Sequence, residues 1–221
     1  MDVAVLFSGG KDSCLALHKV IQEGHKVRYL LSIFPEVQDS FMFHRPNLSL
    51  LERQAKELGV ELIVERSKGE EEKELDDLRR LIGKVKDHVG GVVVGGIASS
   101  YQGERVKKIC DDLELEFLAP LWDFNSERIW KDLLNDGFEV IISKIACDGL
   151  GKEWLGEVID AENLDKLRKL GEKYQFRIDF EGGEAETTVL GMPEFKKHIK
   201  IDFDVESEGE YRHFLKVKKI T

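Results

Sequence analysis

The first half of the chain alternates between short apolar runs, typical of buried strands, and longer segments whose apolar residues recur at helical spacing. The predicted strands span residues 3–7, 26–34, 60–67 and 90–97, and the predicted helices span residues 13–24, 48–59, 70–88 and 104–115. Strands and helices that alternate in this order form a parallel sheet with helices on both faces. The pattern therefore predicts an α/β fold for this half.

The pattern changes near residues 119–122, Ala-Pro-Leu-Trp. Beyond this segment we expect helices at residues 126–137 and around 163–170, strands at residues 138–146 and 176–180, and a hairpin within residues 198–220 that turns around residues 207–209. We therefore predict a first domain of residues 1–122 and a smaller C-terminal α+β domain of residues 123–221.

The turn between the first predicted strand and helix has an unusual composition. It consists of Ser8, Gly9, Gly10, Lys11, Asp12 and Ser13. Glycines let backbone N–H groups approach a ligand, and a helix start offers unpaired N–H donors with a partial positive charge. In an open α/β sheet such a turn lies at the carboxyl ends of the strands, where ligands bind. The turn thus predicts a phosphate-chain site, and the alternative is an ordinary glycine turn with a capping serine.

Composition narrows the class of protein. The net charge of −10, from 33 basic and 43 acidic side chains, argues against stable binding to nucleic acid. The three cysteines, Cys14, Cys110 and Cys147, give neither a disulfide framework nor a metal-ligand pattern. No apolar run approaches the roughly 20 residues that span a bilayer, and no signal peptide is apparent. We expect a cytoplasmic protein that does not enter membranes.

The six-residue turn resembles the pyrophosphate loop (PP-loop) of the N-type ATP pyrophosphatases. Its spacing is too short for the GxxxxGK[ST] loop, and it does not match GxGxxG. The resemblance implies a Rossmann-like fold of the adenine nucleotide α-hydrolase type. It also implies that ATP is cleaved between its α- and β-phosphates, that AMP is placed on a carbonyl oxygen, and that a nitrogen or sulfur nucleophile displaces it.

Three further segments resemble the diphthine–ammonia ligase family of diphthamide synthesis. They are MFHRPN at residues 42–47, GGIASSYQGERVKKIC through LAPLW at residues 95–122, and EGGEAETTVLGMPEFKKHI at residues 181–199. The resemblance implies amidation of diphthine, a modified histidine on translation elongation factor 2, with ATP and ammonium as co-substrates and AMP and pyrophosphate as products. The chain departs from the family pattern on either side of the EGGE motif of residues 181–184, at Phe180 and Ala185, and after the Tyr-Gln pair, at Gly103 and Glu104.

The resemblance also implies roles for individual residues. The residues that would bind the nucleotide are the turn residues 8–13 together with His44, Ser99 and Tyr101. The residues expected in catalysis are Lys11, Asp12, Gln102, Arg105, Glu184 and Glu186. Asp12 is in addition a candidate Mg²⁺ ligand, because Mg²⁺ combines one or two carboxylates with phosphate oxygens. Each of these roles has a plainer alternative: a helix-capping acid, solvent-facing side chains, or a β-turn with solvated acids.

Two other functions stay open from the sequence. A PP-loop enzyme that thiolates transfer RNA would need reactive cysteines and a basic surface. A non-enzymatic nucleotide-binding protein would keep the loop but release no AMP. The sequence also leaves open whether the chain forms a homo-oligomer.

Overall fold

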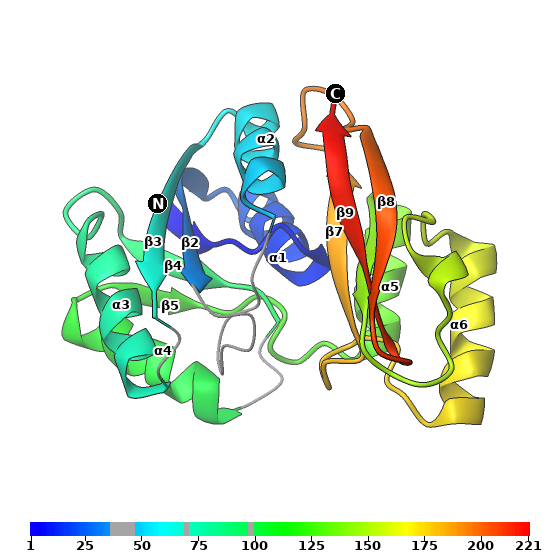
Figure 1. The fold of residues 1–221 in the computed structure, drawn as a ribbon. Coiled ribbons are helices and arrows are strands. Elements are labelled where there is room, and N and C mark those ends of the chain that lie inside the picture. Colours follow the sequence, from blue (N-terminus) through cyan, green and yellow to red (C-terminus); the bar gives the residue numbers. More distant parts are fainter. Residues whose placement is uncertain (36–46, 69–70, 97–99) are drawn as a thin grey trace. The chain divides into compact units, whose positions relative to one another are not determined.

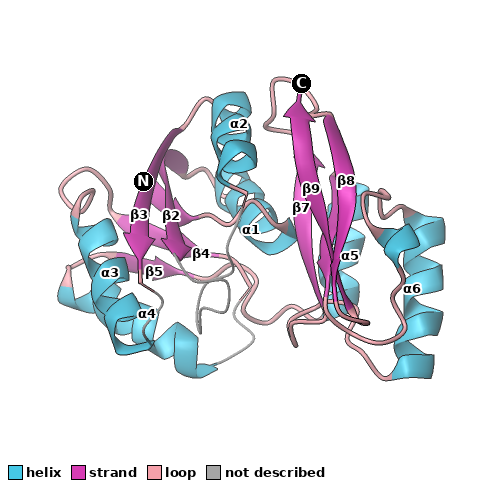
Figure 2. Cartoon of the chain, viewed as in Figure 1, coloured by secondary structure: helices cyan, strands magenta, loops and turns pink. Residues whose placement is uncertain are grey.

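A computed structural model describes residues 1–35, 47–68, 71–96 and 100–221, with the backbone alone for residues 71–73 and 100–102. The chain divides into two compact units, Met1–Asp123 and Phe124–Thr221, which are described separately. Figure 1 follows the chain through both units, and Figure 2 shows their helices and strands.

The first unit is a parallel sheet with four helices. Its elements are β1 (Asp2–Leu6), α1 (Lys11–Gln22), β2 (Lys26–Pro35), α2 (Leu48–Leu58), β3 (Glu61–Ser67), α3 (Glu71–Gly83), β4 (Gly91–Val94), α4 (Ser100–Asp112) and β5 (Glu116–Leu118). The strand order is β3-β2-β1-β4-β5, and every pair is parallel. This is a doubly wound, Rossmann-like sheet, which confirms the fold class predicted from the sequence.

The order of the strands fixes where a ligand can bind. The chain winds outward from β1 to β3 and then returns to place β4 on the other side of β1. The topological switch point therefore lies between β1 and β4, and the loops that follow these two strands meet there. Helices α1 and α2 cover one face of the sheet, and α3 and α4 cover the other (Figure 1).

The face of the sheet that α3 and α4 cover has an apolar core, to which both helices and strands contribute. The core here includes Ala4, Leu31, Val92, Leu78, Leu81, Ile82, Val106 and Ile109. The leucines of the third helix face this core, since Leu78 and Leu81 are fully buried and Leu75 packs against it.

The third helix is shorter than predicted. The sequence suggested a helix over residues 70–88, but α3 ends at Gly83. The N–H of Lys84 is shared between the carbonyls of Arg80 and Leu81, and the N–H of Val85 bonds Ile82. Bonds that reach back three residues tighten the chain into turns, and a glycine at this point weakens the helix.

The end of the first unit also differs from the prediction. Helix α4 begins at Ser100, four residues before the predicted start, and β5 was not predicted. Strand β5 has only three residues, and Glu114 turns the chain into it with φ of 59°. A three-residue strand is too short to show a periodic pattern of its own, so only its pairing with β4 identifies it as a strand.

The second unit combines an antiparallel sheet with helices. Its elements are α5 (Ser126–Asn135), β6 (Glu139–Ile145), the 3₁₀ turn η1 (Lys152–Trp154), α6 (Ala161–Tyr174), β7 (Ala185–Gly191), β8 (Ile201–Glu208) and β9 (Arg212–Ile220). The strand order is β7-β6-β9-β8. The predicted hairpin is confirmed as β8 and β9, although its turn lies at Gly209–Tyr211, slightly later than expected.

The predicted strand at residues 176–180 is wrong. These residues form a turn in which the N–H of Phe180 bonds the carbonyl of Arg177 and Phe180 has φ of 61°. The alternating sequence Phe-Arg-Ile-Asp-Phe suggested a strand with one buried face. Phe176 and Phe180 are indeed buried. Phe180 packs edge-on against Trp130, whose indole N–H donates to the carbonyl of Ile178 at 2.7 Å, so the burial is achieved by a turn.

Candidate functional site

The loop between β1 and α1 leaves the first turn of the helix open to a ligand. The N-cap of α1 is Gly10, in an extended conformation, and no described side chain caps this helix end. The first N–H groups of a helix have no partner within the helix, and they carry a partial positive charge. The loop therefore presents backbone donors suited to an anion.

Two serines stabilise this loop through hydrogen bonds within it. The Ser13 hydroxyl donates to the carbonyl of Gly10 at 3.1 Å and accepts the N–H of Ser8 at 3.3 Å. The two hydroxyl oxygens of Ser8 and Ser13 lie 3.2 Å apart. Gly9 enters the left-handed region with φ of 75°, which a glycine adopts at little cost. The sequence composition of the turn is thus matched to its conformation.

Lys11 and Asp12 form a pair at the start of α1. The Nζ atom of Lys11 lies 2.7 Å from Oδ2 of Asp12, and the lysine is only 2% exposed. The other carboxylate oxygen of Asp12, Oδ1, is buried and has no hydrogen-bond partner. A buried charged oxygen without a partner is costly unless a ligand satisfies it. Asp12 therefore has a free coordination position beside the loop between β1 and α1.

Two residues support the loop from other elements, and the sequence reasoning missed their roles. Gly95, directly after β4, approaches α1 so closely that a Cβ on it would lie 2.6 Å from the backbone nitrogen of Ser13. Gln54 of α2 is fully buried, and its side-chain amide donates to the carbonyl of Gly9 at 2.9 Å. The glycine pair after the fourth strand was a visible signal for the first contact. Nothing in the sequence pattern pointed to the second.

The residues predicted in the neighbouring loops lie partly outside the described residues and partly in α4. His44 and Ser99 lie outside the described residues, and Tyr101 and Gln102 are described by their backbone alone, at the start of α4. Arg105 lies one turn further along α4 and is half-buried. Because α4 follows β4, its N-terminal end stands at the same sheet edge as the loop after β1.

The acidic segment of the second unit is built around Glu184. Its Oε1 atom accepts the backbone N–H of Arg177 at 3.1 Å, while Oε2 is buried without a hydrogen-bond partner. Glu184 also lies close to Gly182, since a Cβ at that position would lie 2.5 Å from its Oε1 atom. The Arg177 guanidinium binds both carboxylate oxygens of Asp179, at 3.0 and 2.7 Å. The turn thus holds one carboxylate oxygen available for a ligand.

Glu186 differs from Glu184 because a cation already neutralises it. Its Oε1 atom lies 2.9 Å from the Nζ of Lys144, across the pair of strands β6 and β7. The sequence grouped the two glutamates as equivalent acids after a glycine pair. The structure separates them, since the neighbour of Glu186 is more than forty positions away in the chain and no local pattern identifies it.

Comparison with known proteins gives the family of this chain. Residues 1–117 match the sequence profile of the diphthamide synthase N-terminal domain, and residues 125–221 match that of its C-terminal domain. The chain belongs to the diphthine–ammonia ligase family. The rat diphthine–ammonia ligase is 34% identical over 91% of this chain and 83% of its own length, and the human one is 32% identical over the same shares.

Other relatives extend this comparison. The fission yeast diphthine–ammonia ligase is 36% identical over 99% of this chain, which spans only 39% of that longer protein. Among solved structures, the predicted subunit of tRNA methyltransferase from Methanocaldococcus jannaschii aligns over 90% of this chain and 99% of that one, with 20% identity and a TM-score of 0.47.

The thiols of this diphthine–ammonia ligase family member are poorly suited to sulfur chemistry. Cys14 and Cys110 are fully buried. Burial raises the pKa of Cys110 to about 11, with a further contribution from Asp111. Burial also raises the pKa of Cys147 to about 11, with the charge of Glu184 adding to it. Since the thiolate is the reactive form, neither Cys110 nor Cys147 is activated at neutral pH.

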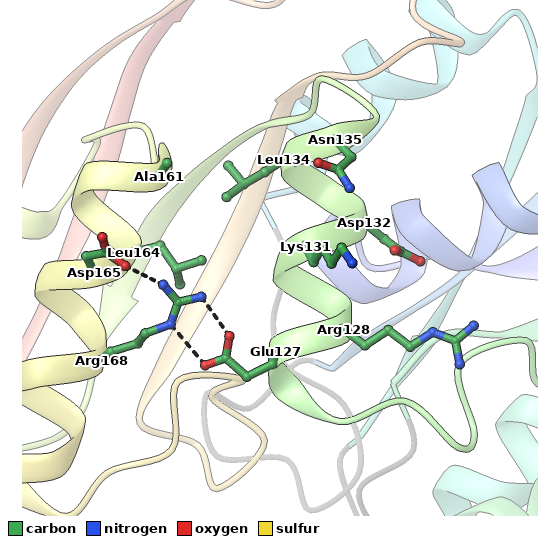
Figure 3. A pocket seen from close by; sticks show the side chains of 10 residues that line it. All are labelled: Glu127, Arg128, Lys131, Asp132, Leu134, Asn135, Ala161, Leu164, Asp165 and Arg168. Atoms are coloured by element: carbon green, nitrogen blue, oxygen red, sulfur yellow. Dashed lines mark hydrogen bonds and ion pairs between the residues drawn. The ribbon is translucent and has the colours of Figure 1, made fainter.

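A hollow in the ligase lies between α5 and α6 and has a volume of about 590 Å³ (Figure 3). Arg168 reaches across it to both carboxylate oxygens of Glu127, at 3.0 and 2.6 Å, and also binds Asp165. This contact lowers the pKa of Glu127. The charges of Arg168 and Glu127 satisfy each other and therefore offer little to a ligand, and an ion pair this exposed contributes little to stability.

No group of three or more His, Cys, Asp or Glu side chains in the described ranges could hold a metal ion. Within the same ranges, no helix is long and apolar enough to cross a membrane. A metal at Asp12 would therefore need ligands beyond those that the described residues supply.

Proposed function

We propose that this chain catalyses the ATP-dependent amidation of diphthine on translation elongation factor 2, with ammonium as the nitrogen donor. The observation that carries the proposal is the open, glycine-rich start of α1, with Lys11 and Asp12 beside it, in a chain whose two halves both match diphthamide synthase domains. The family uses ATP and acts on a protein in diphthamide synthesis. The specific protein substrate and the nitrogen source are part of the proposal.

The reaction needs activation of a carboxylate. A carboxylate oxygen of diphthine attacks the α-phosphorus of ATP, the bond between the α- and β-phosphates breaks, and pyrophosphate leaves. Ammonia then attacks the carbonyl carbon of the acyl-adenylate, AMP leaves with its oxygen, and the nitrogen loses a proton to give the amide. Negative charge accumulates on the departing pyrophosphate, and stabilising it is chiefly electrostatic work.

The residues of the opening turn are placed for that work. The loop would hold the β- and γ-phosphates through Ser8, Gly9, Gly10 and the N–H groups of Asp12 and Ser13. Lys11 would offset the charge of the phosphates. The lysine is held beside Asp12 and away from solvent, where its charge is less screened than at the surface.

Asp12 is the residue that would hold Mg²⁺. Its buried Oδ1 atom has no hydrogen-bond partner, and a carboxylate oxygen next to a triphosphate matches the preference of Mg²⁺. When bound, Mg²⁺ would supply further neutralisation of the phosphate charges. Phosphate oxygens and water would share its coordination, as Mg²⁺ prefers when it is bound through one or two carboxylates.

The remaining roles divide between the two units. In the first unit, His44, Ser99 and Tyr101 would contact the nucleotide, and Gln102 and Arg105 the nucleotide or the acceptor carboxylate. In the second unit, residues 123–221 would supply the acceptor side. There Oε2 of Glu184 has an open acceptor position for ammonium or for the trimethylammonium group of diphthine. Glu186, already paired with Lys144, would act more weakly.

The alternatives are less well supported. Sulfur transfer is not favoured, because Cys110 and Cys147 have raised pKa values and the curated relatives are diphthine–ammonia ligases. A protein that only binds nucleotides would not release AMP. The proposal involves no stable complex with nucleic acid, and a homo-oligomer is compatible with it.

The deciding experiment is mass spectrometry of elongation factor 2 that carries diphthine, after incubation with this protein, ATP and ammonium. The expected result is conversion of the diphthine carboxylate to an amide, with stoichiometric AMP. Omission of ammonium should prevent conversion. ATP turnover without amide formation, when the acceptor and ammonium are both present, would contradict the proposed substrate.

A further inference from the structure

Gln54 is a polar side chain in a position that an apolar residue would be expected to fill. It lies on the buried face of α2 between Leu51 and Ala55, and its exposed fraction is 0%. Burying an amide costs free energy unless it forms hydrogen bonds. Its Nε2 atom donates to the carbonyl oxygen of Gly9 at 2.9 Å, although the two residues are 45 positions apart in the chain.

We propose that Gln54 is a positioning residue for the phosphate-binding loop, which it orients by holding the peptide group between Gly9 and Gly10. The inference rests on the proposed function, because it assumes that this loop binds the phosphates of ATP. Gln54 itself would not touch the ligand. It would act through the direction in which the N–H of Gly10 points.

The geometry of the peptide bond links the hydrogen bond from Gln54 to the direction of the Gly10 N–H. None of the described peptide bonds is cis, so the carbonyl of Gly9 and the N–H of Gly10 point to opposite sides of the same planar group. Gln54 draws the carbonyl toward α2, and the N–H therefore faces away from α2. On that side, within the described part of the chain, it makes a long hydrogen bond of 3.4 Å to the Ser8 hydroxyl, at an exposed position where an anion can replace it.

The loop and α2 also fit each other sterically. A Cβ at Gly9 would lie 2.2 Å from Oε1 of Gln54 and 2.9 Å from a methyl carbon of Leu51. Gly9 has φ of 75°, so the same residue satisfies both the turn and the close approach of the amide. The glycine at position 9 thus allows the close approach of α2 to the loop backbone, and the glutamine at position 54 supplies the hydrogen bond to that backbone.

Two substitutions separate positioning from simple packing. Gln54→Met keeps a similar volume but removes the donor. Gln54→Glu keeps the shape, and its carboxyl group can donate to the carbonyl of Gly9 only when it is protonated. Dissociation constants for ATP and for pyrophosphate would be measured by calorimetry for each variant, together with the unfolding temperature of the ligand-free protein. Lys56→Met, on the exposed side of α2, is the matched control.

The expected result is that Gln54→Met binds ATP and pyrophosphate about tenfold more weakly, the equivalent of one lost hydrogen bond. Gln54→Glu should bind still more weakly at pH 8, where an ionised carboxylate repels the Gly9 carbonyl. Its affinity, expressed relative to the wild-type protein at the same pH, should recover as the pH falls toward 5.5, whereas that of Gln54→Met should not.

Each outcome bears on the inference. If the variants are less stable but bind both ligands like the wild-type protein, Gln54 only fills space and the inference is overturned. If Gln54→Met does not fold, the pH series of Gln54→Glu decides, and an affinity ratio that does not change with pH overturns it. If the wild-type protein binds neither ligand, the proposed function fails and the inference falls with it.

Discussion

The Nζ atom of Lys11 and the Oδ2 atom of Asp12 lie 2.7 Å apart, which leaves the other oxygen of Asp12 buried and without a hydrogen-bond partner. The pair stands at the first turn of α1, where backbone N–H groups also converge. A positive side chain, free N–H donors and an unsatisfied carboxylate oxygen occur together at one helix start. This combination suits a phosphate chain with a bound metal ion.

The first prediction concerns the charge of Lys11. Lys11→Met keeps the apolar stem of the buried side chain and removes the ammonium group. We expect turnover of ATP to fall by about 100-fold, the usual order for loss of one group that stabilises transition-state charge. Steady-state AMP release measures the effect, and Lys56→Met, an exposed position of α2, is the control. Wild-type turnover in the Lys11 variant would show that the loop does not hold the reacting phosphates.

The second prediction concerns the bond that is cleaved. The short loop resembles that of the N-type ATP pyrophosphatases, so the products should be AMP and pyrophosphate. Chromatography of the nucleotides after reaction with ammonium and the diphthine-bearing acceptor measures this directly. Formation of ADP and inorganic phosphate would exclude attack at the α-phosphorus.

The third prediction distinguishes the two glutamates of the second unit. Glu184→Gln removes the charge from a carboxylate with an open oxygen, so amide formation should fall by at least tenfold while ATP affinity is retained. Glu186→Gln should have a smaller effect, because Lys144 already neutralises Glu186. Glu208→Gln, at an exposed position at the end of β8, serves as the control. Equal loss of ATP binding and amide formation in Glu184→Gln would place this residue in the nucleotide site instead.

The fourth prediction separates amidation from sulfur transfer. A variant with Cys14, Cys110 and Cys147 all changed to Ala should keep ammonium-dependent AMP release, because the nucleophile arrives from solution. It should be less stable by about 1 kcal/mol for each buried site, owing to small cavities. Activity and denaturant unfolding are measured on the same preparation. A folded variant that binds ATP without turnover would favour a thiol-dependent reaction.

The fifth prediction concerns pH and the thiol of Cys110. Burial raises its pKa to about 11 from an ordinary value of 9.0, so the folded protein holds this proton more tightly than the unfolded chain. The stabilisation is fully present below pH 9 and is lost as the pH rises through 11. Denaturant unfolding of the wild-type protein and Cys110→Ala, compared from pH 8 to 11, should show the wild type losing more stability. Parallel curves would mean that the thiol has no raised pKa.

Local patterns in the sequence determined much of the first unit and one hairpin of the second. The strand, glycine turn and helix around residues 8–13 are neighbours in the chain, so their order and approximate bounds follow from short-range preferences. The end of α2 at Gly59, with φ of 69°, likewise reflects a single residue. The hairpin of β8 and β9 follows from alternation on either side of a glycine turn. These features need no knowledge of distant contacts.

Tertiary structure decided what depends on partners far away in the chain. Strand β5 exists because β4 offers it an edge, and residues 176–180 form a turn because Phe180 is buried against Trp130. The bond from Gln54 to Gly9 and the pairing of Glu186 with Lys144 each join residues more than forty positions apart. The sequence alone determined which residues form the loop that we propose binds phosphate. Only packing between separate elements determined how that loop is held, because such contacts have no local period.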